Sequence, residues 1–221
     1  MAPDLAPVEG GITVVYVDEA ILVLNKPAGL LSVPGRGSDK QDCLSTRAAK
    51  LFDDAMIVHR LDMATSGLLV MARGVAVQRT LSAAFATRKV HKRYVAMVSG
   101  EVEDAHGTWR TIDLPIAVDW PHRPRRVIAV TGGQPSLTRL RTQHFDPNRR
   151  VTRVELEPLT GRTHQLRVHL LATGHPILGD ALYAPTLVQE MASRLLLHAS
   201  ELGFSHPVRG NPLHFTCMAD F

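Results

Sequence analysis

The chain has 221 residues, of which 45% are hydrophobic and 21% charged, so collagen-like, low-complexity and disordered classes are excluded. Its 25 Lys and Arg residues outnumber its 21 Asp and Glu residues, giving a formal net charge of +4. No apolar run approaches the ~20 residues of a membrane-spanning helix, and residues 1–11 lack the apolar core of a secretion signal. Cys43 and Cys217 form no CxxC pair, which fits a reducing compartment and argues against a zinc ribbon or a redox motif. We therefore expect a cytoplasmic protein with no membrane partner.

In the first half of the chain, the pattern alternates short strands with helices. Residues 12–16 and 20–24 are rich in β-branched and aliphatic side chains, and Asp18-Glu19 separates them as a turn. Residues 45–52 predict a short helix, and the apolar run 68–72 predicts a buried strand. Residues 74–89 predict the clearest helix, with apolar residues every four positions and two basic residues in its last turn. Residues 91–99 then alternate as a strand.

The second half predicts a hairpin followed by a helix. Segments 138–143 and 151–157 flank the turn signal Asp146-Pro147-Asn148. Residues 163–173 predict a helix with Thr163 as its N-cap and Gly174 just after its end. No repeat and no linker is visible. We therefore expect one α+β domain over residues 1–221, with a mostly antiparallel sheet and a flexible lead-in at 1–11.

Basic residues gather in two runs. One run on its own is more often a solvated face than a binding site, but two runs in a basic chain favour a polyanionic partner such as nucleic acid. The runs are Arg88, Lys89, Lys92 and Arg93, and Arg123, Arg125 and Arg126.

The densest group of polar residues occupies the loop 59–67. An acid, Asp62, stands beside Arg60 and His59, with two hydroxyl residues after it and an apolar run on either side. Such a loop can be a plain turn whose polar side chains bond the local backbone. It can equally present a carboxylate on a rigid scaffold for catalysis.

A second polar group surrounds the start of the helix predicted at 163–173. Arg162, His164, Arg167 and His169 follow one another closely here. The histidines are either half-buried core residues or metal ligands, but the absence of HExxH, CxxC and paired carboxylates disfavours a metal. Arg167 lies beside a position expected to be buried, and a buried arginine requires an acid. Asp62 is the candidate for that acid.

Together these stretches resemble the RluA-type pseudouridine synthases, specifically a short subgroup without an N-terminal S4 RNA-binding domain. The resemblance runs from about residue 14 to the C-terminus. The matching stretches are Asn25-Lys26-Pro27-Ala28-Gly29-Leu30, His59-Arg60-Leu61-Asp62, Thr65-Ser66-Gly67-Leu68-Leu69, residues 160–170, Gly174-His175-Pro176-Ile177-Leu178-Gly179-Asp180 and Leu196-Leu197-His198-Ala199.

The resemblance implies an α+β fold with one mixed, mostly antiparallel sheet, flanking helices and a central basic cleft. It implies isomerisation of uridine to pseudouridine in stem-loops of large-subunit rRNA, the tRNA anticodon loop, or both, without cofactor or metal. We also expect a monomer without an obligate protein partner. Asp62 matches the catalytic aspartate, Tyr94 the tyrosine that packs on the target base, and Arg167 the arginine that pairs with the aspartate.

Four further residues are expected to handle the RNA. A target base must leave its stack to react, and the gap that it leaves must be filled. Arg60 matches a base-flipping arginine, and either Arg60 or the neighbouring His59 is expected to fill this gap. Leu197 matches an apolar residue that lines the pocket, and Arg162 is expected to contact the RNA. No S4 domain is expected.

Two other function classes compete with this interpretation. A non-catalytic RNA-binding or ribosome-assembly factor would use the same cleft, but binding alone does not need a carboxylate facing a polyanion. An RNA glycosidase releasing uracil would need a second acid. Asp180 is the nearby candidate, and it is explained more simply as a helix N-cap.

Overall fold

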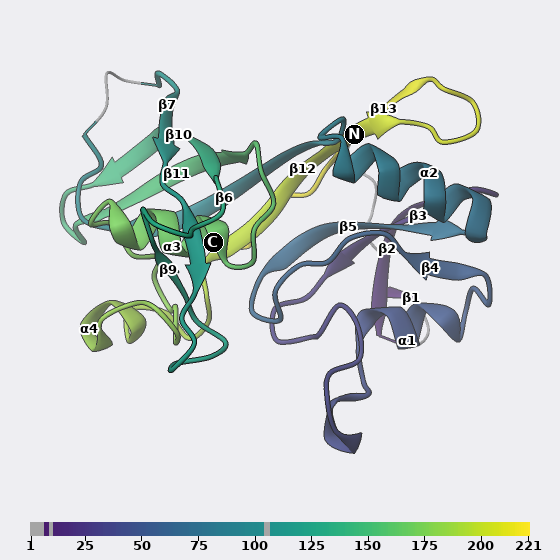
Figure 1. Cartoon of the computed structure of the whole chain (residues 1–221), viewed down its shortest axis with the longest axis horizontal. Helices are drawn as coiled ribbons and strands as arrows, with labels where there is room; N and C mark the ends of the chain where they lie inside the picture. Colours follow the sequence, from purple (N-terminus) through teal and green to yellow (C-terminus); the bar gives the residue numbers. More distant parts are fainter. Residues whose placement is uncertain (1–6, 9–10, 104–106) are drawn as a thin grey trace. The chain divides into compact units, whose positions relative to one another are not determined.

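The computed structural model describes residues 7–8, 11–103 and 107–221 (Figure 1), so most of the lead-in expected at 1–11 lies outside the described residues. The chain forms two compact units. We call residues 1–92 with 198–220 the first unit, and residues 93–197 with Phe221 the second unit. That residues 1–221 act as one catalytic domain stays a prediction. No helix in the described part of the chain is long and apolar enough to cross a membrane.

The first unit is built on a sheet with the strand order β1-β2-β3-β5-β12, to which β4 adds beside β5 and β13 beside β12. β5 and β12 pair in parallel, whereas β2–β3 and β3–β5 are antiparallel. The strands expected at 12–16, 20–24 and 68–72 are confirmed. The elements are β1 (Pro7–Val8), β2 (Ile12–Val17), β3 (Ile21–Lys26), η1 (Ser38–Lys40), α1 (Leu44–Ala49), β4 (Ala55–Ile57), β5 (Ser66–Arg73), α2 (Val75–Ala86), β12 (Leu197–Ser205) and β13 (Pro212–Thr216).

The core of the first unit forms where α2 covers the sheet. Leu81 is buried among side chains of β3 and β5, and Val77 and Phe85 pack beside it, as the four-residue spacing predicts. The end of α2 differs from the expectation. Helix α2 ends at Ala86, so the basic residues at 88 and 89 lie beyond it, and Arg88 has a left-handed φ of 59°.

Gly67 shows why the junction of β5 and β12 needs a glycine. Its φ is 111°, and it lies opposite Ala199 in the parallel pair. A Cβ at this position would come within 2.3 Å of the Ala199 carbonyl oxygen. The close strand contact just after the Asp62 loop therefore depends on the absence of a side chain.

The second unit contains the antiparallel order β6-β11-β10-β7 and a small sheet of β8 and β9. The expected hairpin is β10 and β11, joined by a turn in which the Asp146 carboxylate accepts backbone bonds from Asn148 and Arg149. The elements are β6 (His91–Ser99), β7 (Arg110–Asp113), β8 (Ile116–Val118), β9 (Arg126–Ile128), β10 (Leu137–Asp146), β11 (Val151–Pro158), α3 (Gln165–Ala172) and α4 (Thr186–Gln189). Together the two units confirm the α+β class.

Helix α3 begins later than its sequence predicts. It starts at Gln165, so the expectation of Thr163 as N-cap is wrong, and the residue before the helix, His164, has a left-handed φ of 58°. The Gln165 amide explains this start, because its oxygen accepts from the backbone N–H of Arg162 and its nitrogen donates to the Leu137 carbonyl. Gly174 follows the helix as expected, with a φ of 86°.

Trp109 is the centre of a charged cluster on the strands of the second unit. The guanidinium carbons of Arg93, Arg139 and Arg141 lie 5.5, 4.9 and 4.7 Å from its ring centroid. Glu155 bonds two of these arginines, Arg93 and Arg141. These arginines are therefore partly neutralised and held against an aromatic face.

Candidate active site

Asp62 lies in the loop between β4 and β5 of the first unit, where it is half-buried. Its carbonyl accepts a hydrogen bond from the Thr65 N–H at 3.1 Å, which closes a turn. The preceding residue, Leu61, is bound at both backbone groups by one side chain. The Ser32 hydroxyl donates to the Leu61 carbonyl at 2.8 Å and accepts from the Leu61 N–H at 3.1 Å. The backbone that presents the carboxylate is therefore fixed on both sides.

Lys26, at the end of β3, also holds the loop that carries Asp62. Its side chain is fully buried, and its ammonium donates to the carbonyls of Pro27, Leu30 and Met63 at 2.8, 2.7 and 3.0 Å. Burial lowers the pKa of Lys26 to about 8, while the negative charge of Asp62 acts in the opposite direction. Sequence reasoning missed this role, and Lys26, which comes two residues after the apolar run 21–24, carried no sequence signal for it.

His59 begins the loop and is held inside the first unit. Its Nε2 accepts from the Val70 N–H at 3.1 Å, and its ring stacks on Phe85 with centroids 4.3 Å apart. Burial lowers the pKa of His59 to about 3, and the positive charge of Lys92 acts in the same direction. The ring is therefore neutral with its proton on Nδ1, and it positions the loop. The next residue, Arg60, is exposed.

In the second unit, Arg167 is bound by an acid other than the one the sequence suggested. Arg167 is 4% exposed, and its Nε and Nη2 donate to the two oxygens of Asp180 at 2.8 and 2.5 Å. Asp180 also accepts from the backbone N–H groups of Leu182 and Tyr183. Asp180 thus caps a turn, so the expectation that it caps a helix is wrong. A pairing of Arg167 with Asp62 stays a prediction.

A cavity of about 510 Å³ lies beside the start of α3, within the second unit. Trp120, Arg126 and Arg162 are among the side chains that line it. Trp120 is 69% exposed, and the guanidinium carbon of Arg123 lies 3.6 Å from its ring centroid. An exposed aromatic ring with several guanidinium groups suits nucleic-acid bases and phosphates. The structure therefore places Arg162 next to part of the second basic run.

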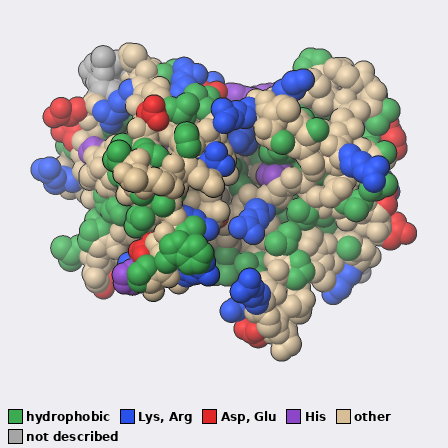
Figure 2. Space-filling view, in the orientation of Figure 1, with side chains coloured by type: hydrophobic (Ala, Val, Ile, Leu, Met, Phe, Trp, Pro, Cys, Tyr) green, Lys and Arg blue, Asp and Glu red, His purple; other side chains and the backbone are tan. Residues whose placement is uncertain are grey.

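The seven predicted site residues fall into two groups. His59, Arg60 and Asp62 share one loop of the first unit. The second unit holds the other four, with Tyr94 on β6 opposite Leu156 and Leu197 buried at the start of β12. Figure 2 shows Lys and Arg side chains exposed on both units. The arrangement of one group against the other stays a prediction.

Comparisons with known proteins agree with these observations. The family model described as RNA pseudouridylate synthase matches residues 20–172, a range that includes Asp62, Tyr94 and Arg167. The chain is 48% identical over 208 residues to the Dual-specificity RNA pseudouridine synthase RluA of Yersinia pestis, covering 94% of this chain and 99% of that protein. It is 46% identical over 215 residues to the protein of the same name from Escherichia coli strain K12, covering 97% and 96%.

A solved structure extends the agreement to the fold. Human RNA Pseudouridylate Synthase Domain Containing 1 superposes with a TM-score of 0.78 at 29% identity, covering 96% of this chain and 85% of that chain. The Asp62 loop, the order of the motifs and these likenesses lead to one conclusion. The chain belongs to the RluA-type family of RNA pseudouridine synthases, which are isomerases.

Proposed function

We propose that Asp62 is the catalytic carboxylate and that the substrates are stem-loops of large-subunit rRNA and of tRNA. The observation that carries the proposal is the loop itself, in which Lys26 and Ser32 hold the backbone around a half-buried carboxylate. The relatives' names describe dual specificity, which supports two classes of RNA substrate. The protein acts as a monomer in the cytoplasm, a compartment that suits its two buried, unpaired cysteines.

The chemistry needs one ionised carboxylate and no second reactant. The bond from uracil N1 to ribose C1′ breaks, the base turns, and C5 bonds to C1′. C5 loses its proton and N1 gains one, so atoms and electrons balance within the substrate. Asp62 acts either as a nucleophile or as a base, and both roles require the charged form.

The RNA-handling residues complete the proposal. Arg60 is exposed on the loop that carries Asp62, which suits insertion into the stack that the target base leaves. Tyr94 packs on the flipped uracil, Leu197 lines its pocket, and Arg167 pairs with Asp62. The cavity beside Arg162 receives flanking nucleotides.

The glycosidase alternative loses support from the surroundings of Asp180. A second acid must exchange protons with the leaving base or with water. Asp180 is 1% exposed, and its two oxygens already accept four hydrogen bonds from Arg167, Leu182 and Tyr183. The carboxylate is therefore committed to the fold.

A tritium-release assay tests the proposal. RNA stem-loops from large-subunit rRNA and from tRNA, labelled at uridine C5, are incubated with the wild type, with Asp62→Asn and with the control Asp53→Asn, which changes an exposed acid. We expect Asp62→Asn to lower release at least about 100-fold and Asp53→Asn to leave it unchanged. Release that persists in Asp62→Asn would remove Asp62 from its role, and free uracil would indicate a glycosidase.

A further inference from the structure

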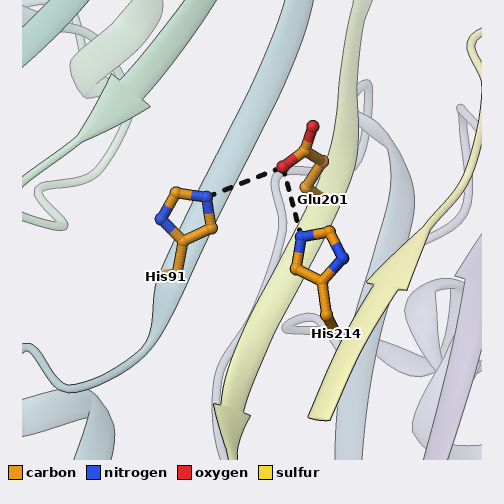
Figure 3. A group of neighbouring side chains, drawn as sticks. All are labelled: His91, Glu201 and His214. Carbon is orange, nitrogen blue, oxygen red and sulfur yellow. Dashed lines mark hydrogen bonds and ion pairs between the residues drawn. The ribbon is translucent and has the colours of Figure 1, made fainter. Parts of the chain in front are cut away.

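A second polar cluster lies in the first unit and has no part in the proposed reaction. His91 at the start of β6, Glu201 on β12 and His214 on β13 point toward one another (Figure 3). The Nε2 atoms of His91 and His214 lie 3.6 and 3.3 Å from the same oxygen, Oε2 of Glu201. The three ligand atoms all lie within 4.8 Å of one another.

The strand register explains how these side chains meet. Glu201 pairs with Thr216, and Gly203 pairs with His214. Glu201 and His214 are therefore diagonal neighbours on one face of β12 and β13, a separation that long side chains can bridge. Gly203 lies between the two histidines, since a Cβ there would be in van der Waals contact with both, 3.4 Å from His214 Cδ2 and 3.4 Å from His91 Cβ.

The donor atoms match a transition-metal ion in kind and in spacing. Zinc binds imidazole nitrogens and carboxylate oxygens at ~2.0–2.1 Å in tetrahedral geometry, which places neighbouring ligand atoms about 3.4 Å apart. The two Nε2–Oε2 distances, 3.6 and 3.3 Å, bracket that value. Imidazole disfavours calcium and magnesium, which prefer oxygen ligands. The side chains are 35%, 25% and 55% exposed for His91, Glu201 and His214, so water has access to a fourth position.

We propose that His91, Glu201 and His214 form a binding site for a divalent transition-metal ion of the zinc class. The ion ties β13 and the start of β6 to β12, and it takes no part in uridine isomerisation. Sequence reasoning expected no metal and did not consider these three residues, because His91 is separated from the other two by more than a hundred residues and the three form no spacing motif.

A second group of possible metal ligands in the first unit already has a cation among its partners. Asp18, Glu19 and His206 also bring three ligand atoms together. Arg209 already supplies the cation there, since its Nη2 lies 2.5 Å from Glu19 Oε1 and 3.7 Å from Asp18 Oδ2. Asp18 also accepts from the backbone N–H groups of Ala20 and Ile21. These two carboxylates are therefore already bound to a guanidinium group and to backbone N–H groups.

The experiment titrates Zn²⁺ into the metal-free full chain by calorimetry, and titrates Co²⁺ with detection of its visible absorption bands. The variants are His214→Ala and Glu201→Gln, which retains the size of the side chain and an acceptor oxygen. The matched control is His122→Ala, because His122 is an exposed histidine that contacts one acid, Asp119. Far-UV circular dichroism checks that each variant folds.

We expect one equivalent of Zn²⁺ to bind the wild type and His122→Ala with equal affinity. His214→Ala and Glu201→Gln should each weaken binding more than about 10-fold, because even the outer partners of metal ligands have effects of that size. Zn²⁺ binding that is equal in wild type and His214→Ala, or absent from both, overturns the proposal. Tritium release should be unchanged in both variants. Loss of Zn²⁺ binding therefore tests the metal site alone, whereas tritium release tests the proposed function.

Discussion

The two units bury a cation next to their candidate site residues in different ways. In the first unit, Lys26 is surrounded by three backbone carbonyls, and its pKa falls to about 8 because dipoles only partly replace water. In the second unit, Arg167 meets the full charge of Asp180 through two hydrogen bonds. The lysine fixes three points of the backbone at once, whereas the arginine joins one helix to one turn. The first arrangement suits positioning a loop, and the second suits holding a helix.

Removing the acid of the second unit should have the largest effect. Asp180→Ala leaves the Arg167 guanidinium without the carboxylate that binds two of its nitrogens. We expect the free energy of unfolding to fall by about 3–5 kcal/mol, measured by urea denaturation. Asp54→Ala is the control, because its ion pair with Arg73 is more exposed and should contribute about 0–1 kcal/mol. Similar losses in both variants would show that burial does not set the strength of the Arg167–Asp180 pair.

Lys26 should make the stability of the protein depend on alkaline pH. Its pKa is about 8 in the folded chain, against the ordinary lysine value of 10.5, so the unfolded chain binds more protons between these values. Stability therefore rises with pH across this window, by about 3 kcal/mol at its upper end. Lys26→Met should flatten that rise in urea denaturation series from about pH 7.5 to 10. An unchanged slope would show that the ammonium is not desolvated.

Ser32→Ala tests the positioning of Asp62 with a smaller change. The substitution leaves the buried N–H and carbonyl of Leu61 without the Ser32 hydroxyl, which should cost about 1–3 kcal/mol. Tritium release should fall because the loop loses its fixed geometry. Ser38→Ala, at an exposed position in η1, is the control and should change neither quantity. Full activity in Ser32→Ala would show that the two hydrogen bonds between Ser32 and Leu61 are not needed for catalysis.

The smallest effects should come from the two helix ends, where each unit uses the same motif with a different residue. Arg88 follows α2 with a φ of 59°, and Gly174 follows α3 with a φ of 86°. Each donates its N–H to a carbonyl three residues earlier, and the next N–H bonds a carbonyl five residues back. Arg88→Gly should stabilise the protein by about 1 kcal/mol, and Gly174→Ala should destabilise it by a similar amount. Thermal unfolding measures both, and shifts of the same sign would refute the prediction.

The elements that sequence predicted well are those with strong local patterns. β5 is a continuous apolar run and α2 has a regular four-residue spacing, so both were found. Strands β12 and β13 were missed because they carry mixed polar residues and gain their stability from neighbours distant in the chain. The N-cap of α3 was misplaced because the Gln165 side chain, rather than Thr163, organises its first turn.

The same distinction applies to the site. The Asp62 loop was identified because its chemistry is concentrated in a few consecutive residues. The anchoring role of Lys26 was not identified from the sequence, since a lysine after an apolar strand is normally expected to reach solvent. The pairing of Arg167 with Asp180 depends on a turn between them that only tertiary structure defines.

The chain contains two tryptophans, and both Trp109 and Trp120 belong to the second unit. Both rings contact guanidinium groups, but Trp109 is half-buried whereas Trp120 is largely exposed. Intrinsic emission excited at the red edge will consequently follow the melting of residues 93–197 alone. A fluorescence trace that precedes or lags the far-ultraviolet signal would reveal that the halves melt separately, without any label being attached.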